Sequence, residues 1–312
     1  MTTAFYTHAD CARHEMGSWH PESPARLQAI DDQLIASRIS NLLDHREAPV
    51  AQESALARVH SQDAIERIRE NCPNVNADDK YFPLDADTTL NPYTWRAALR
   101  AAGAALAATD AVIDGEIENA FCAIRPPGHH ATPVESMGFC MFNNVAIAAK
   151  HALEVRGLQR VAVVDFDVHH GNGTEESFRN DPRVLMVSFF QHPFYPYTGT
   201  EHPASNMVNL PVPAHSAGDV VRQLVMEKWL PALHQQRPEM IFISAGFDAH
   251  REDEMGQMGL VEADYAWITQ QIKDVAKLYA QGRIVSCLEG GYHLSALGRS
   301  VVAHIKVLAE LD

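Results

Sequence analysis

The sequence predicts a single α/β domain over residues 1–312, built on a mostly parallel open sheet with helices on both faces. Three observations support this fold class: short apolar runs recur along the chain, amphipathic helical patterns separate several of them, and no repeat or low-complexity linker divides the 312 residues. Strands that are apolar throughout, rather than at alternate residues, are typical of parallel sheets covered on both faces.

Six strands and six helices are expected. The strands are AFYTH (4–8), NAFCAIR (119–125), RVAVVDFD (160–167), RVLMVSFF (183–190), EMIFISAGFD (239–248) and RIVSCLEGG (283–291). The helices, whose apolar residues recur every three to four positions, span 25–39, 95–114, 144–155, 217–236, 263–280 and 294–311. Five segments are too long for ordinary connections and are candidate binding loops: 9–24, 73–91, 126–142, 191–207 and 247–262.

Composition and charge argue against several classes of protein. The chain has 40 acidic against 25 basic residues, a formal charge of -15 that repels a phosphate backbone, so nucleic acid is not an expected partner. The 5 cysteines are scattered and contain no CxxC pair, which favours neither a disulfide framework nor a thiolate zinc site. The N-terminal segment lacks the pattern of a secretory signal, and no window approaches ~18 apolar residues. A cytoplasmic protein without membrane contact is therefore expected.

The segment DFDVHHGNGT gathers carboxylates and imidazoles at the end of an apolar run. Buried carboxylates need a counter-ion, because an unpaired buried charge is costly. In an extended segment, Asp165, Asp167 and His169 project to one side, and Asp248 ends another strand in the same manner. Asp167, His169 and Asp248 form a set that holds a divalent ion such as zinc and leaves a position open. The competing interpretation, that the two Asp residues only cap the next helix, is weakened by Asp248.

Two further loops follow strands at the same edge of the sheet. In RPPGHHA the prolines and the glycine stiffen the turn and present His129 and His130, and a histidine near activated water can act as general base and acid. Asp165 is a candidate orienting partner for one of them. In CLEGGYHL two glycines precede Tyr292, whose hydroxyl can donate to an oxyanion. The isolated histidines are expected to be ordinary structural residues: His45, His151, His234 and His304.

Six motifs resemble, in order and spacing, the zinc-dependent histone deacetylases and their bacterial histone deacetylase-like amidohydrolase relatives. They cover nearly the whole chain: HPESPARL (20–27), RPPGHHA (125–131), GFCMFNN (138–144), DFDVHHGNGT (165–174), SAGFDAH (244–250) and EGGY (289–292). The resemblance implies the arginase/deacetylase-like fold and one catalytic zinc ion. It implies these roles: zinc ligands Asp167, His169 and Asp248; general base and acid His130; its electrostatic neighbour His129, paired with Asp165; and carbonyl-polarising Tyr292.

The resemblance also implies a structural potassium ion and a set of substrate-facing residues. The potassium ion would be held by Asp165, Asp167, His169, Ser188 and the backbone of Phe189. The walls of an acyl-lysine tunnel match Phe139, beside Gly138, and Tyr195. Two more positions complete the set, Asp87 against the substrate backbone at the rim and Arg26 near an internal cavity behind the metal.

Two positions refine the expected activity. Asn172 in HHGNG is typical of class II-like members, and Tyr292 is present where some weakly active class II members carry His, so an active class II-type enzyme is expected. Met255 occupies the gate position at which polyamine-selective relatives carry Glu, which favours acyl-lysine substrates. A shift of one residue would bring Glu254 into the gate instead.

The expected activity is zinc-dependent hydrolysis of acetyl or other acyl groups from lysine side chains. The expected partner is an acylated lysine peptide or protein or a small acetylated amine, and an acetylpolyamine amidohydrolase is the alternative. A dinuclear manganese hydrolase of the arginase type needs further carboxylates at the strand ends, and a non-catalytic acyl-lysine reader has no need of His129, His130 and Tyr292. The sequence leaves open the physiological substrate, the acyl length, zinc against iron in vivo, and whether the chain forms a homo-oligomer.

Overall fold

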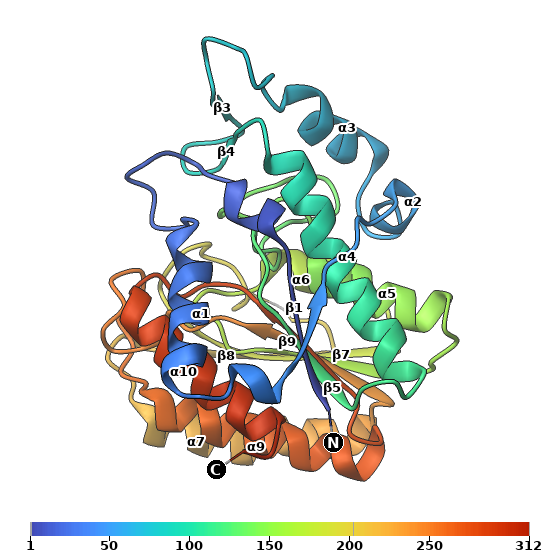
Figure 1. Cartoon of the computed structure of the whole chain (residues 1–312). Helices are drawn as coiled ribbons and strands as arrows, with labels where there is room; N and C mark the ends of the chain where they lie inside the picture. The colour runs from blue at the N-terminus through green and yellow to red at the C-terminus, as the bar shows by residue number, and fades with distance from the viewer. Residues whose placement is uncertain (1, 202, 312) are drawn as a thin grey trace.

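Eight parallel strands form the central sheet in the order β2-β1-β5-β10-β9-β6-β7-β8, and helices cover both faces (Figure 1). The computed structural model describes residues 2–201 and 203–311, and these strands lie within them. The expected fold class is confirmed, whereas the domain limits of 1–312 stay a prediction. The strands span β1 Thr3–Thr7, β2 Asp44–Glu47, β5 Asn119–Cys122, β6 Val161–Asp165, β7 Val184–Gln191, β8 Met207–Val212, β9 Met240–Ala245 and β10 Ile284–Leu288.

Helices lie on both faces of the sheet and beyond one end of it (Figure 1). They span η1 Ala9–Arg13, α1 Ala25–Ala36, η2 Ser40–Leu42, α2 Glu53–Leu56, α3 Gln62–Asn71, α4 Thr94–Ile113, α5 Asn144–Glu154, α6 Asn172–Phe178, α7 Gly218–Leu224, η3 Val225–Trp229, α8 Leu230–Gln236, α9 Glu262–Tyr279 and α10 Leu294–Leu308. Helices α4 and α5 pack together on one face, and α1, α9 and α10 pack together on the other (Figure 1). Within residues 2–201 and 203–311, no helix has the length and hydropathy needed to cross a membrane.

Several elements were not expected from the sequence. Strands β2 and β8 close opposite edges of the sheet, and they carry charged residues or proline because an edge strand has one side without a partner. The helices α2, α3 and α6 have 4, 10 and 7 residues, and each buries at most three apolar residues. The helix expected over 217–236 is present, but the five-residue π-helical turn η3 interrupts it.

The strand order brings four loops together at one edge. Strands β9 and β10 come late in the chain, yet they lie between β5 and β6. Because all four strands are parallel, the loops that follow β5, β10, β9 and β6 emerge side by side at the carboxyl edge of the sheet, where ligands of open α/β folds bind. These four loops carry every predicted zinc ligand and every predicted catalytic residue except Asp165, which is the last residue of β6.

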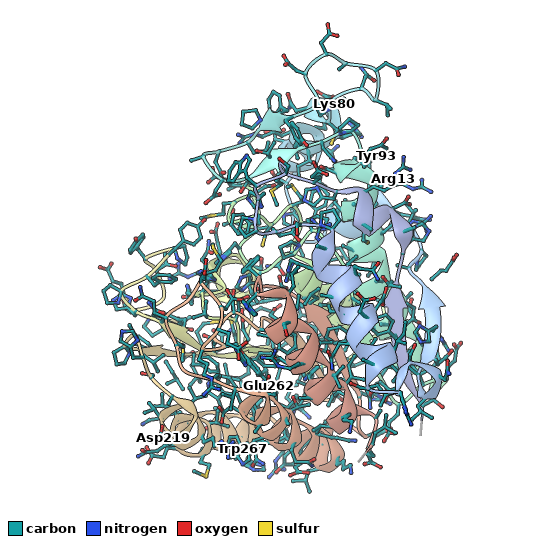
Figure 2. All side chains as sticks on the ribbon, turned by 60° about the vertical axis from the view of Figure 1, so that its left-hand side comes forward. Arg13, Lys80, Tyr93, Asp219, Glu262 and Trp267 are labelled. Atoms are coloured by element: carbon teal, nitrogen blue, oxygen red, sulfur yellow. The ribbon has the colours of Figure 1, made fainter. Side chains whose placement is uncertain are left out.

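An additional layer lies beyond this part of the sheet, at the top of Figure 1. It consists of α2, α3 and the antiparallel hairpin of β3 (Phe82–Pro83) and β4 (Thr89–Leu90). Figure 2 labels Arg13, Lys80 and Tyr93 at this end of the molecule, and the Arg13 guanidinium lies 3.8 Å from the centre of the Tyr93 ring. The turn of the hairpin carries Asp87, so a separate excursion of the chain supplies the predicted rim residue.

A buried ion cluster connects the first long loop to the carboxyl edge. Glu22, Arg26 and Arg125 are each 0% exposed. The Glu22 carboxylate accepts from Arg26 Nη1 at 3.0 Å and from Arg125 Nη2 at 2.6 Å. Burial by itself would raise the pKa of Glu22, but Arg125 and Arg26 outweigh it and lower the pKa to about 2. Arg26 in turn donates to the carbonyl oxygens of Glu289 and Gly291, so the cluster holds the loop after β10.

Replacing Glu22 with Gln leaves two buried guanidinium groups without their shared anion, and we expect the free energy of unfolding to fall by about 3–5 kcal/mol at neutral pH. The pKa of folded Glu22, about 2, lies below its ordinary value of 4.5, so the carboxylate contributes fully above about pH 4.5 and its contribution fades as the pH falls toward 2. Denaturant titrations over a pH series should therefore show the gap between wild type and variant narrowing on acidification.

The control for this experiment is Glu116→Gln, which removes a partly exposed ion pair with Arg46 and should cost less than about 1 kcal/mol. A gap between wild type and Glu22→Gln that stays constant as the pH falls would show that the Glu22 charge does not stabilise the fold.

Candidate metal centre and active site

The segment after β6 bends immediately instead of continuing as a strand. The strand ends at Asp165, whose Oδ1 accepts from the N–H of Asp167 at 3.1 Å, and Asp167 Oδ1 accepts from the N–H of His169 at 2.9 Å. Such carboxylate bonds to the backbone two residues later turn the chain. The expectation that residues 165–169 form an extended segment is therefore wrong. Strand β9 likewise ends at Ala245, three residues before Asp248. Turns, not strand alternation, bring the side chains together.

Asp167, His169 and Asp248 lie together and are buried. His169 Nδ1 lies 3.0 Å from Asp167 Oδ1 and 3.3 Å from Asp248 Oδ2, and the potential ligand atoms all lie within 4.8 Å of one another. Asp248 Oδ1 accepts from the N–H of Val168 at 2.9 Å, whereas the buried Oδ2 has no hydrogen-bond partner. The set thus keeps a buried oxygen free for a cation.

Two glycines lack a side chain at the positions where the carboxylates of Asp167 and Asp248 lie. A Cβ atom at Gly290 would lie 2.0 Å from Asp248 Oδ2 and 2.6 Å from Asp167 Oδ2, and one at Gly246 would lie 2.1 Å from Asp167 Oδ2. The N–H of Gly290 also donates to Asp167 Oδ2 at 2.9 Å. Gly246 of SAGFD and Gly290 of EGGY are therefore required by these carboxylates, and the arrangement fits a divalent ion with two carboxylate ligands and one imidazole.

The charges at this centre also fit a bound cation. Burial and the neighbouring Asp167 raise the pKa of Asp248 to about 7. Burial lowers the pKa of His169, but Asp167 and Asp248 outweigh it and raise the pKa to about 10. A cation coordinated at this imidazole must displace its proton, so metal affinity rises with pH.

The two adjacent histidines differ in their partners and therefore in charge. His129 Nδ1 lies 3.0 Å from Asp165 Oδ2, and the carboxylates of Asp167 and Asp165 outweigh the effect of burial and raise the pKa of His129 to about 10. His130 Nδ1 instead lies 2.8 Å from the Asn172 amide oxygen. Burial and the charges on His129 and His169 hold the pKa of His130 well below its ordinary range. A protonated and a neutral imidazole thus lie side by side, with ring centres 4.0 Å apart.

A pocket of about 320 Å³ opens over this centre. His130, His169 and Tyr292 lie among its lining residues, so the candidate chemistry lies within reach of a ligand. Five of the six predicted substrate-facing residues line it, and Arg26 does not. The complete lining is Asp87, His130, Gly138, Phe139, His169, Phe194, Tyr195, Glu254, Met255 and Tyr292.

The pocket wall that contains Phe139 has a left-handed backbone and is held by a histidine. Gly138 and Phe139 have φ of +55° and +69°, and a Cβ atom at Gly138 would lie 2.6 Å from His130 Cδ2. The ring of His20 packs edge-on against Phe139 with centres 4.5 Å apart, and its Nε2 lies 3.1 Å from the carbonyl oxygen of Asp87. One residue of the HPESPARL motif thus connects the wall to the rim.

The remaining predicted residues lie around the pocket. Arg26 is buried behind it, with its guanidinium 4.8 Å from the centre of the Tyr292 ring. Ser188 lies opposite Asp165 in the pairing of β7 with β6, and its Oγ donates to Asn209 at 3.4 Å. The neighbouring Phe189 is buried. The potassium site predicted at these residues stays a prediction.

The sequence interpretation missed several residues that support the site. Glu289 is fully buried, and its Oε2 accepts from the N–H groups of Gly128 and His129 at 2.7 and 3.1 Å. Phe194 lines the pocket beside Tyr195. Glu289 lies inside the EGGY motif. A charged residue directly after an apolar strand was the signal in the sequence that could have identified it.

The four isolated histidines lie outside the pocket lining, as expected. His304 is buried between Thr269 and Ser286, and His151 pairs with Asp110 at 2.7 Å. His45 bonds to Ser40, and His234 bonds to Tyr279.

Known proteins are similar to this chain over nearly its whole length. The family model of the histone deacetylase domain matches residues 20–308. The histone deacetylase-like amidohydrolase of Pseudomonas aeruginosa is 37% identical over 88% of this chain and 72% of its own length. A probable deacetylase of Archaeoglobus fulgidus is 35% identical over 100% of this chain and 88% of its own length. The matched range includes every predicted site residue.

A solved structure extends the similarity to three dimensions. The crystal structure of the HDA15 HD domain superposes with a TM-score of 0.91 at 32% sequence identity, and the match covers 99% of this chain and 90% of that chain. An uncharacterised protein of Synechocystis sp. is 39% identical over 96% of this chain and 97% of its own length.

Asp248→Ala should abolish firm metal binding, because two protein ligands rarely hold zinc. Wild-type protein should bind one divalent ion per chain, and elemental analysis after exhaustive dialysis should find the variant empty while its circular dichroism is unchanged. Asp219→Asn, an exposed substitution that Figure 2 places far from the hairpin, is the control and should keep full occupancy. Full occupancy in Asp248→Ala would show that this residue is not a ligand.

Proposed function

The chain belongs to the histone deacetylase family, and on this basis we propose that it is a zinc-dependent amidohydrolase that removes acetyl or other acyl groups from lysine side chains. Membership of the family makes it a deacetylase-family hydrolase. The observation that carries the finer proposal is that one pocket is lined by His169 of the buried metal-ligand set, by an uncharged histidine and by a tyrosine. A reducing compartment is also proposed, supported by the five free cysteines.

Asp167, His169 and Asp248 would hold the ion. Zinc is proposed because two carboxylates and one imidazole leave a coordination position for water or substrate. When bound, such an ion stabilises negative charge on a carbonyl oxygen and lowers the pKa of water. A potassium ion near Asp165 and Ser188 is proposed from the family resemblance.

His130 is the proposed general base and acid. Its Nδ1 is engaged by Asn172 and the residue lines the pocket, so Nε2 is the nitrogen left for proton transfer, and the low pKa keeps the ring neutral at pH 7. A neutral imidazole accepts a proton from the attacking water and returns it to the nitrogen of the leaving amine. The protonated His129 beside it adds positive charge near the developing oxyanion.

Tyr292 is the proposed donor to the oxygen of the tetrahedral adduct. Burial raises the pKa of Tyr292 well above its ordinary value, so the phenol keeps the proton that it donates. Its ring packs edge-on against Phe139 with centres 5.8 Å apart, which orients the hydroxyl-bearing ring in the pocket. A preorganised donor of this kind stabilises the oxyanion without reorganisation.

The walls and rim of the pocket support an extended acyl-lysine as substrate. Phe139, Phe194 and Tyr195 line an apolar passage that suits the methylene stem of lysine, and Asp87 lies at the rim, where it can accept from substrate N–H groups. Met255 and Glu254 both line the pocket, so an apolar side chain and a carboxylate lie near the same opening. Glu254 is the observation that favours the second candidate, an acetylpolyamine amidohydrolase.

His130→Ala should keep the metal and the fold but lose about 10²–10⁴-fold in kcat, the usual contribution of a general acid–base group. Steady-state kinetics with metal analysis of the same samples checks this. His234→Ala removes a histidine that bonds Tyr279 away from the pocket and should turn over like wild type. A loss below about tenfold in His130→Ala would exclude the proton-transfer role.

A substrate panel tests the proposed function itself. Acetyl-lysine peptides, longer acyl-lysine peptides, acetylspermidine and acetylputrescine should be compared on protein of known metal content, and the highest kcat/KM is expected for an acyl-lysine peptide. Glu254→Gln identifies the alternative, because loss of a carboxylate that binds a substrate ammonium would lower kcat/KM for the polyamines selectively. If kcat/KM for an acetylpolyamine exceeds kcat/KM for every peptide, and Glu254→Gln removes this difference, the polyamine function replaces the proposed one.

A further inference from the structure

Asp253 joins two parts of the pocket through main-chain hydrogen bonds. The residue lies in the loop 247–262 and is 5% exposed. Its Oδ2 accepts from the N–H groups of Tyr292 at 2.6 Å and His293 at 2.9 Å, and its Oδ1 accepts from the N–H of Met255 at 3.0 Å. One side chain therefore ties the segment that carries the phenol to the segment that forms a pocket wall, although 39 positions separate Asp253 from Tyr292.

The segment that carries the phenol depends on such external ties. Two glycines precede Tyr292, and Gly291 has φ of +116°, a conformation that glycine adopts without strain. Arg26 holds the carbonyl oxygens of Glu289 and Gly291. Asp253 supplies the matching hold on the N–H side, at Tyr292 and the next residue. The backbone on which the phenol is mounted is thus held from two sides by buried side chains of other loops.

We propose that Asp253 is a positioning residue for Tyr292, which it holds in register with the Met255 wall of the pocket. This inference rests on the proposed function, in which the Tyr292 hydroxyl meets the oxyanion. Donors of this kind act only at hydrogen-bond distance from the oxyanion, and a displacement of about 1 Å can cost 10²-fold in rate. Asp253 does not line the pocket, so its effect must pass through Tyr292 and Met255.

Asparagine at this position tests the role sharply, because it keeps the shape but has one acceptor oxygen in place of two. If the amide oxygen faces Tyr292 and His293, the amide NH2 group faces the N–H of Met255. In the opposite orientation the amide NH2 group faces the N–H groups of Tyr292 and His293. Either way the connection between the two segments is lost, because one side meets donor against donor.

The experiment is a double-mutant cycle of Asp253→Asn and Tyr292→Phe. Asp253→Asn should lower kcat about tenfold to a hundredfold with unchanged metal content, whereas in the Tyr292→Phe background it should lower kcat less than about threefold, because the donor it positions is gone. Asp181→Asn is the matched control, since Asp181 also accepts a backbone N–H, from Arg183 at 3.1 Å, but lies three residues before β7, at the amino ends of the strands. Its kcat should equal that of wild type.

Amide hydrogen exchange supplies a readout that needs no activity. The N–H groups of Tyr292 and His293 should exchange faster in Asp253→Asn than in wild type and unchanged in Asp181→Asn. If Asp253→Asn does not fold, Asp253→Glu, which keeps both oxygens but displaces them, takes its place with the same expected losses.

The outcomes separate this inference from the proposed function. A kcat loss of equal size in both backgrounds, wild-type kcat in Asp253→Asn, or unchanged exchange at Tyr292 would each overturn the positioning role. Wild-type protein that hydrolyses no substrate of the panel would overturn the proposed function, and the exchange rates would then decide alone whether Asp253 holds the tyrosine segment.

Discussion

The burial of negative charge at one edge of the sheet governs the rest of this structure. Asp165, Asp167, Asp248 and Glu289 are each at most 1% exposed. A buried carboxylate is costly unless it is paired and hydrogen-bonded, so the surrounding chain must supply donors. The turns after β6, the N–H groups of the RPPGHH loop and the imidazoles all meet this need. Chain geometry at the edge thus follows from the charges, and Asp248 Oδ2, which accepts no hydrogen bond, is the oxygen that a cation in the proposed metal centre would compensate.

The same constraint separates two neighbouring histidines in charge. The carboxylates of Asp167 and Asp165 raise the pKa of His129, whereas burial and the charges on His129 and His169 lower the pKa of His130, whose hydrogen-bond partner is an uncharged amide. A pair of like groups in unlike surroundings is the usual way in which an active site assigns separate proton roles at one pH. Asn172 therefore matters in two ways: its amide oxygen accepts a hydrogen bond, and its side chain carries no charge.

The sequence located the candidate metal ligands better than the residues that support them. Asp167, His169 and Asp248 were recognisable because polar residues that end apolar strands have few structural explanations. The turns that bring them together were not, since bonds from side chain to backbone depend on local dihedral angles that no periodicity reports. Strands β2 and β8 escaped for a related reason, because edge strands need not be apolar. Asp253 lies among acidic loop residues and differs from them only in burial, which the sequence does not reveal.

The insertion of β9 and β10 between β5 and β6 has a consequence for biosynthesis. While the ribosome has made only the first 239 residues, the inner edges of β5 and β6 have no strands to pair with, and Asp248, Glu289 and Tyr292 do not yet exist in the chain. Unpaired strand edges of a nascent parallel sheet attract other chains, so this interval is the one in which a chaperone is of most use. A chain that ends before residue 248 therefore lacks one of the three candidate metal ligands, and a chain that ends before residue 292 lacks the phenol of Tyr292.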